Sequence, residues 1–208
     1  MIYYLITIVV AYLLGSIPTA VWVGKTWHGI DIREHGSKNA GATNTFRVLG
    51  KKAGIAVLSI DVSKGVLAVL IPVLIFPLFD TISETQLDRF QISAAVFAVV
   101  GHIFPLFANF QGGKGVATSL GIVLGIEPLS ATICLLIFLI VFILSKYVSL
   151  GSIIASFCFP ICVCFLKPHN LELKIFSLVL GALVIFAHRK NIRRLLNHEE
   201  GKMNLFKK

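Results

Sequence analysis

Long apolar runs constrain the fold of this chain more than any other feature. Six such runs cover residues 2–24, 53–79, 91–110, 128–145, 148–166 and 173–188. A transmembrane helix needs about 20 consecutive, mostly apolar residues, so runs of this length predict membrane-spanning helices. Charged residues make up 14% of the chain, against about 25% in soluble domains. We therefore expect an all-α, polytopic integral membrane bundle, surrounded by lipid, that forms a single domain over residues 1–208.

A seventh apolar run, residues 116–126, is shorter than the others. It ends at Glu127-Pro128, and a proline there favours a break before the following helix. We count this run as a short or partly buried span, which gives about seven transmembrane helices. Five or six spans remain the alternative, because a segment of this length is ambiguous.

The basic residues indicate how these helices are oriented. The net charge is +9, and Lys and Arg concentrate in residues 25–52, 111–115, 146–147 and 189–208, whereas residues 80–90 are poor in them. Cytoplasmic loops carry such an excess of positive charge. The first lysine follows the first apolar run, so we expect an uncleaved first helix with its N-terminus outside and the C-terminus in the cytoplasm. Because the charge lies between apolar runs, it does not indicate nucleic-acid binding.

The cysteines suggest packing rather than chemistry. All four lie inside apolar runs, without a histidine at a metal-binding spacing: Cys134, Cys158, Cys162 and Cys164. Buried cysteine commonly behaves as a small hydrophobic residue. The sequence therefore predicts no metal site, and it indicates neither another cofactor nor an obligate protein partner.

The first polar segment between apolar runs, residues 29–50, is rich in glycine and asparagine. Small residues let backbone N–H groups approach an anion, while hydroxyl, amide and guanidinium groups add donors. A capped turn is an equally good interpretation of this composition. The candidate anion-binding residues are Ser37, Lys38, Asn39, Thr43, Asn44 and Arg47.

The second polar segment reads Gln111-Gly112-Gly113-Lys114-Gly115 and opens an apolar run. Glycines around a lysine at a helix N-terminus are typical of a phosphate-binding loop. A Walker A loop is excluded, because Ala108 occupies the position of its first glycine and Gly115 follows the lysine. The alternative is a flexible turn, since glycine-rich turns are common.

The third polar segment follows the last apolar run. His188 and Asn191 lie three residues apart and would share one face of a continuing helix. A basic stop signal, with side chains that reach the interface, explains the arginines of this segment but not this pair. We expect Glu200 to brace Arg193 or Arg194 rather than to act in chemistry.

Asp61, Lys64 and His102 lie away from the ends of apolar runs. Charges in the bilayer centre are costly, about 3 kcal/mol on insertion scales, so they pair or line a wet cavity. Asp61 and Lys64 lie three residues apart, and a structural pair is as good an interpretation as a direct role in a site. His102 either supports the glycine loop or is a hydrogen-bonded core histidine, and we favour the second.

Together these segments resemble one known family, the bacterial acyl-phosphate:glycerol-3-phosphate acyltransferases, or PlsY-type membrane enzymes. The matching stretches keep their order from near residue 15 to near residue 200. They are Gly15-Ser16-Ile17-Pro18 with Asp31–Gly50, His102–Thr118, Tyr147–Leu150, and His188–Leu196. This combination is far more specific than any single loop.

Three positions depart from the family pattern. Glycine is usual where Lys38 and His198 stand, and lysine is usual where Gln111 stands. A lysine at position 38 argues against a positive φ there, and its charge can compensate for the lysine that is missing at position 111.

The resemblance implies an enzyme that transfers an acyl group from acyl phosphate to the 1-hydroxyl of glycerol 3-phosphate. The products are lysophosphatidic acid and phosphate, and the reaction is the first step of bacterial phospholipid synthesis at the inner membrane. The implied site faces the cytoplasm. Ser37, Arg47 and His188 are expected to act in catalysis, and Lys38, Asn39, Thr43, Asn44, Gly112, Gly113, Lys114, Gly115 and Asn191 in substrate binding. Asp61, Lys64, His102 and Glu200 are expected to support the site.

A small transporter for an organic phosphate is the competing interpretation, because such proteins also carry intramembrane charges. Transporter sites lie near the bilayer midplane between repeats. Here the polar residues concentrate near one expected face and no repeat is evident, so the enzyme is favoured.

Overall fold

The computed structural model describes residues 2–78 and 81–203, and all the regular structure in those two ranges is helical. The helices fall into two compact units, Met1–Ile126 and Glu127–Lys208. The predicted all-α class is therefore confirmed. The last residue of the predicted run 53–79 and the end of the predicted basic tail, residues 204–208, lie outside the described residues.

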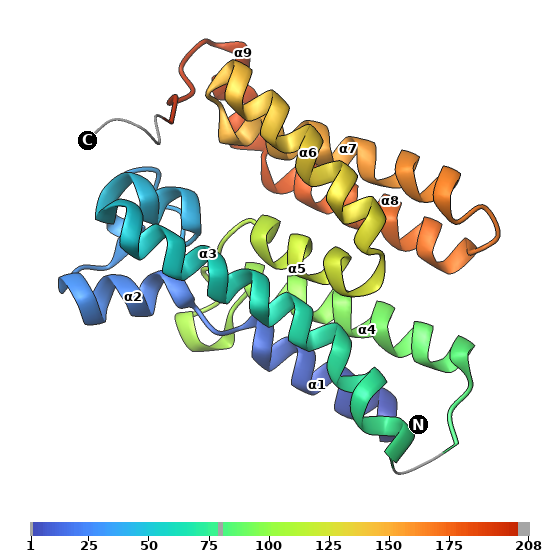
Figure 1. The fold of residues 1–208 in the computed structure, drawn as a ribbon. Coiled ribbons are helices and arrows are strands. Elements are labelled where there is room, and N and C mark those ends of the chain that lie inside the picture. The colour runs from blue at the N-terminus through green and yellow to red at the C-terminus, as the bar shows by residue number, and fades with distance from the viewer. Residues whose placement is uncertain (1, 79–80, 204–208) are drawn as a thin grey trace. The chain divides into compact units, whose positions relative to one another are not determined.

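The first unit contains α1 (Ile2–Gly15), α2 (Thr19–His28), α3 (Ala42–Ile75), α4 (Glu84–Ile103) and α5 (Val116–Ile126). Short 3₁₀ turns lie between them: η1 (Ile32–Glu34), η2 (Phe76–Leu78) and η3 (Leu106–Ala108). Helix α1 packs along α4, and α3 packs along α5 (Figure 1). Glycines make these contacts close: a Cβ on Gly15 would lie 2.1 Å from the Ala98 carbonyl oxygen, which is the small-residue packing that membrane helices favour.

Two of the expected helices are broken near their polar ends. The first predicted run is divided between α1 and α2, where Pro18 precedes the first residue of α2. Helix α3 begins before its predicted run, but Gly50 has φ 85° and ψ −175° and interrupts it. Residues 42–49 therefore form a separate short helix that carries Thr43 and Arg47.

The second unit contains α6 (Pro128–Ser145), α7 (Val148–Leu166), α8 (Leu171–Ala187) and α9 (Arg189–Leu196). Helices α6 and α7 have the boundaries that their apolar runs predicted. They pack side by side, and α7 also packs on α8 (Figure 1). The chain continues as a helix beyond His188, which is α9, and α9 bends by 57° from α8.

Five helical segments of the described residues are long and apolar enough to cross a membrane, and a sixth results if α8 and α9 form one span. The expected count of about seven is therefore too high. Helix α5 has 11 residues and is about 16 Å long, roughly half of the bilayer hydrocarbon core. The structure thus supports a polytopic membrane bundle with five or six candidate spans, the alternative that the sequence left open.

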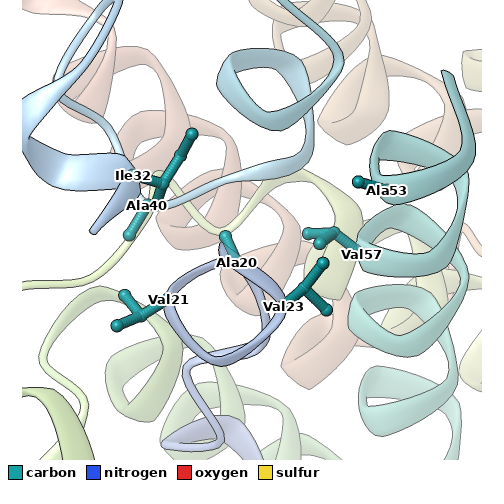
Figure 2. Close-up of a cluster of buried hydrophobic side chains, with 7 residues drawn as sticks. All are labelled: Ala20, Val21, Val23, Ile32, Ala40, Ala53 and Val57. Atoms are coloured by element: carbon teal, nitrogen blue, oxygen red, sulfur yellow. The ribbon is translucent and has the colours of Figure 1, made fainter. Parts of the chain in front are cut away.

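A small apolar cluster holds the first polar segment against the helices (Figure 2). Ala20 and Val23 of α2 face Ala53 and Val57 of α3, while Ile32 packs from the segment that follows α2. Burial of aliphatic side chains stabilises this arrangement by about 25 cal/mol per Å² of apolar surface. The cluster therefore supports a polar segment in which Ser37, Lys38 and Arg47 are exposed.

Candidate functional site

The buried side chain of Asn44 holds the first loop, residues 29–50, in shape. Its side chain is 1% exposed, and Oδ1 accepts a hydrogen bond of 2.8 Å from the Ser37 backbone N–H. Nδ2 donates to the carbonyl oxygens of Ile32 and His35 at 3.1 and 3.0 Å. Because both amide protons are donated within the loop, a substrate contact through Nδ2 would break one of these bonds. The geometry gives Asn44 a positioning role in the loop, and its expected part in substrate binding stays a prediction.

Ser37 and Lys38, which lie next to the hydrogen bonds of Asn44, are exposed. Lys38 has φ 58°, so the prediction that a lysine argues against a positive φ at this position is wrong. His198, the other residue that stands where the family has glycine, also has φ 58°. Both positions keep the left-handed conformation that glycine adopts most easily, at a cost of about 1 kcal/mol for another residue.

An ion pair ties the first loop to η3, the turn that precedes the second polar segment. Arg33 donates to both carboxylate oxygens of Asp31, at 2.9 and 2.6 Å, and its Nη1 donates to the Ala108 carbonyl at 3.0 Å. The bond from Arg33 holds the pKa of Asp31 well below its usual range. The pair therefore stays charged at neutral pH and connects η1 with η3.

The glycine loop is fastened to the end of α4. The Gly112 and Gly113 N–H groups donate to the carbonyl oxygens of Ile103 and His102, both at 3.1 Å. These two N–H groups are thereby bonded within the protein, and the substrate-binding role expected for the two glycines stays a prediction. Lys114 follows these glycines and adds a positive charge beside the start of α5. The N–H groups of the first turn of α5 precede its first internal hydrogen bond and suit an anion.

The two loops lie against each other within the first unit. A Cβ on Gly113 would lie 2.9 Å from the Ala40 carbonyl oxygen and 2.3 Å from His102 Nε2. Glycine is therefore needed at position 113 for packing. Arg47 is exposed on the helix of residues 42–49, and Lys114 is half-buried. The structure thus brings together two cation-bearing loops that are far apart in the sequence.

The expected pairing of Asp61 with Lys64 is present. Lys64 Nζ lies 3.0 Å from Asp61 Oδ1, and both side chains are buried. Lys64 also donates to the Ile17 carbonyl at 2.9 Å, and Thr19 donates to Asp61 at 3.0 Å. The pair therefore satisfies polar groups at the break between α1 and α2, which stabilises charge at a depth where an unpaired charge would be costly.

His188 and Asn191 lie in the second unit and are buried there. His188 Nδ1 lies 2.8 Å from the Val184 carbonyl oxygen. Because a carbonyl oxygen only accepts, Nδ1 carries the proton and Nε2 is the acceptor nitrogen of the neutral ring. Asn191 donates to Glu200 Oε1 at 2.6 Å.

Glu200 is the centre of a polar cluster in the second unit. It accepts hydrogen bonds of 2.6 Å from Ser149, Asn191 and Arg194, so the expected contact with Arg194 is confirmed. Burial alone would raise the pKa of Glu200, but these three bonds outweigh it and lower the pKa below its ordinary value of 4.5. Ser149 had no assigned role in the sequence analysis, although Tyr147–Leu150 was part of the resemblance.

The first unit thus joins a helical bundle of membrane-spanning length to a rigid, cationic pair of loops. These features define an integral membrane protein with a candidate site for an anion.

Comparisons with known proteins identify the family. The family model for glycerol-3-phosphate acyltransferase matches residues 5–198. Curated glycerol-3-phosphate acyltransferases of Chlorobaculum tepidum and Staphylococcus carnosus are 41% and 43% identical, and the matches cover 100% and 94% of this chain and 100% and 96% of the relatives. The crystal structure of PlsY (YgiH) in its glycerol 3-phosphate form superposes with a TM-score of 0.86, at 37% identity, over 98% of this chain and 99% of that one.

The chain therefore belongs to the glycerol-3-phosphate acyltransferase family. It is an integral membrane acyltransferase of phospholipid synthesis, as the sequence resemblance predicted, and the transporter interpretation falls away.

Proposed function

We propose that the acyl donor is acyl phosphate and that the acceptor is the 1-hydroxyl of glycerol 3-phosphate. The bond between the acyl carbon and the phosphate oxygen breaks, and an ester bond to glycerol forms. The hydroxyl proton leaves with the phosphate, and the products are lysophosphatidic acid and inorganic phosphate. A solved PlsY structure in a lysophosphatidic acid form supports this product for the family.

One observation carries the proposal: the two glycine-rich loops adjoin at Gly113 and Ala40. Each loop brings a cation, Arg47 on one side and Lys114 on the other. Both reactants carry phosphate, so their approach requires that negative charge be neutralised in one place. The positive end of α5 adds to this field.

The remaining side chains have distinct proposed roles. Ser37 donates its hydroxyl to a phosphate oxygen or to the reacting carbonyl, while Lys38, Asn39 and Thr43 contact phosphate. An acyl-enzyme is not needed, because acyl phosphate is already an activated anhydride. His188 and Asn191 are assigned to the glycerol moiety, and Glu200 fixes Asn191 and Arg194.

The purified protein tests the choice of donor. With acyl phosphate and glycerol 3-phosphate, we expect phosphate and lysophosphatidic acid to appear in equal amounts, and we expect no product with acyl-CoA. Intact mass after acyl phosphate alone should show no acyl adduct. Transfer from acyl-CoA at a comparable rate, or an adduct that Ser37→Ala abolishes, would contradict the proposal.

A further inference from the structure

One buried polar cluster lies among the helices of the first unit and contacts the glycine loop of the proposed site. It consists of Asp61, Lys64, His102 and Thr118, from α3, α4 and α5, and each of these side chains is at most 6% exposed. In the proposed reaction none of them touches a substrate. A buried, hydrogen-bonded polar cluster stabilises a particular arrangement of the elements that it joins.

His102 is the residue at which this cluster meets the glycine loop. Helix α4 ends at Ile103, so His102 lies in its last turn, although the predicted apolar run extends to residue 110. Its carbonyl accepts the Gly113 N–H at 3.1 Å. Its ring lies over the same glycine, since a Cβ on Gly113 would lie 2.3 Å from Nε2. His102 therefore contacts the loop through both main chain and side chain.

The other edge of the ring faces α5. His102 Nδ1 lies 3.1 Å from Thr118 Oγ1, which is within hydrogen-bond distance for either tautomer, and 3.9 Å from Asp61 Oδ1. Thr118 is the third residue of α5. The N–H groups of this first turn are those that we assign to phosphate, so the bond holds the loop and the helix start in one register.

The ion pair of Asp61 and Lys64 lies beside the His102 ring and limits its movement. Asp61 accepts from Thr19 and Lys64 at 3.0 Å each, so its position is fixed by α2 as well as by α3. The approach of α3 to α5 is equally tight, because a Cβ on Gly65 would lie 2.2 Å from the Thr118 carbonyl oxygen. Thr118 thus has little freedom to move away from His102.

We infer that His102 and Thr118 are positioning residues of acyl transfer, which set Lys114 and the start of α5 at the distance that the phosphate groups require. This inference rests on the proposed function and deepens it. Loss of the bond leaves the fold intact and leaves the cations present, but it loosens the loop. We therefore expect kcat of acyl transfer to fall, since small misplacements of binding groups lower the rate of catalysis.

The test replaces Thr118 by valine, which keeps the shape and removes the hydroxyl. We expect kcat for phosphate release to fall about tenfold, with the melting temperature in detergent changed no more than by the control. Thr118→Ser, which restores a hydroxyl, should bring kcat back to within twofold. The matched control is Thr7→Val in α1, where a buried threonine hydroxyl donates to the Tyr3 carbonyl at 2.7 Å, and its kcat should stay at the wild-type value.

A double substitution separates positioning from general damage. If the two side chains act as a unit, His102→Gln combined with Thr118→Val should lower kcat no further than His102→Gln alone. Should His102→Gln fail to fold, the valine and serine variants of Thr118 decide the question by themselves. The inference would be overturned if the two substitutions lowered kcat multiplicatively. It would also be overturned if kcat of Thr118→Val stayed within twofold of wild type. Wild-type turnover of acyl phosphate in the same preparation shows separately whether the proposed reaction occurs.

Discussion

At the scale of single residues, two of the positions where the family usually has glycine combine backbone strain with a polar side chain. Lys38 and His198 both adopt φ 58°, where a non-glycine residue costs about 1 kcal/mol. Lys38 lies in the proposed phosphate site, whereas His198 lies in the second unit beyond α9. A strained residue that persists in a site suggests that its side chain is useful there.

The variant Lys38→Gly is therefore expected to change stability and activity in opposite directions. Relief of the left-handed strain should raise the melting temperature in detergent, while loss of a charged phosphate contact should raise KM about tenfold. Thermal unfolding and steady-state kinetics on the same preparation measure both effects.

His198→Gly is the matched control for the strain alone. It should be stabilised by a similar amount and keep its KM. Lys38→Arg, which retains the charge and the strain, should behave as the wild type. A Lys38→Gly enzyme with unchanged KM would remove Lys38 from the site.

At the scale of helices, the pairing of α3 with α5 depends on glycine. A Cβ on Gly121 would lie 2.0 Å from the Val62 carbonyl oxygen, which is backbone and cannot move aside. One turn later, a Cβ on Gly125 would meet Val69 Cγ2 at 2.5 Å, and a valine methyl can rotate away.

We therefore expect Gly121→Ala to separate the helices and Gly125→Ala to be tolerated. The first should lower the melting temperature and the yield of folded protein in detergent strongly, because overpacking typically costs 1–3 kcal/mol and here meets backbone. The second should cost less. Equal effects of the two substitutions, measured by size-exclusion chromatography and thermal unfolding, would show that this contact does not set the helix spacing.

Helix boundaries were predictable where local signals decide them. Helices α6 and α7 match their apolar runs. The early start of α4 at Glu84 also has a local signal, because Ser83 and Gln86 form a capping box, a pattern that can be recognised in sequence. The apolar run itself begins only at residue 91, so apolar residues alone do not indicate this start.

The details of the site depend on contacts that no local pattern contains. The sequence identified both glycine-rich loops and their cations. It did not show that the side-chain amide of Asn44 donates both of its protons within its own loop. Nor did it show that the Gly112 and Gly113 N–H groups bond to the end of α4. These are consequences of long-range packing, as is the pairing of Thr118 with His102.

At the scale of the whole molecule, the membrane orientation stays a prediction from charge. Positive residues should place the loops at positions 38 and 111 in the cytoplasm and residues 80–90 outside. In a variant whose four native cysteines are replaced, single cysteines at Lys38, Gln111 and Thr85 can report this, since all three positions are exposed.

A membrane-impermeant thiol reagent added to intact cells should label Thr85→Cys alone. After the cells are opened, it should label all three variants. Position 113 is unsuitable, because a side chain there would collide with His102. Labelling of Lys38→Cys and Gln111→Cys from outside would place the site on the opposite side of the membrane.

The central claim is that the two loops act together on phosphate, and kinetics of Arg47→Ala, Lys114→Ala and the double variant test it most directly. Each single variant should remain folded in detergent and lose about 100-fold in kcat/KM for phosphate release from acyl phosphate, as expected for a group that stabilises developing charge. The double variant should lose less than the product of the two, since the cations share one pair of reactants. Activity within a few fold of wild type in either single variant would contradict the account.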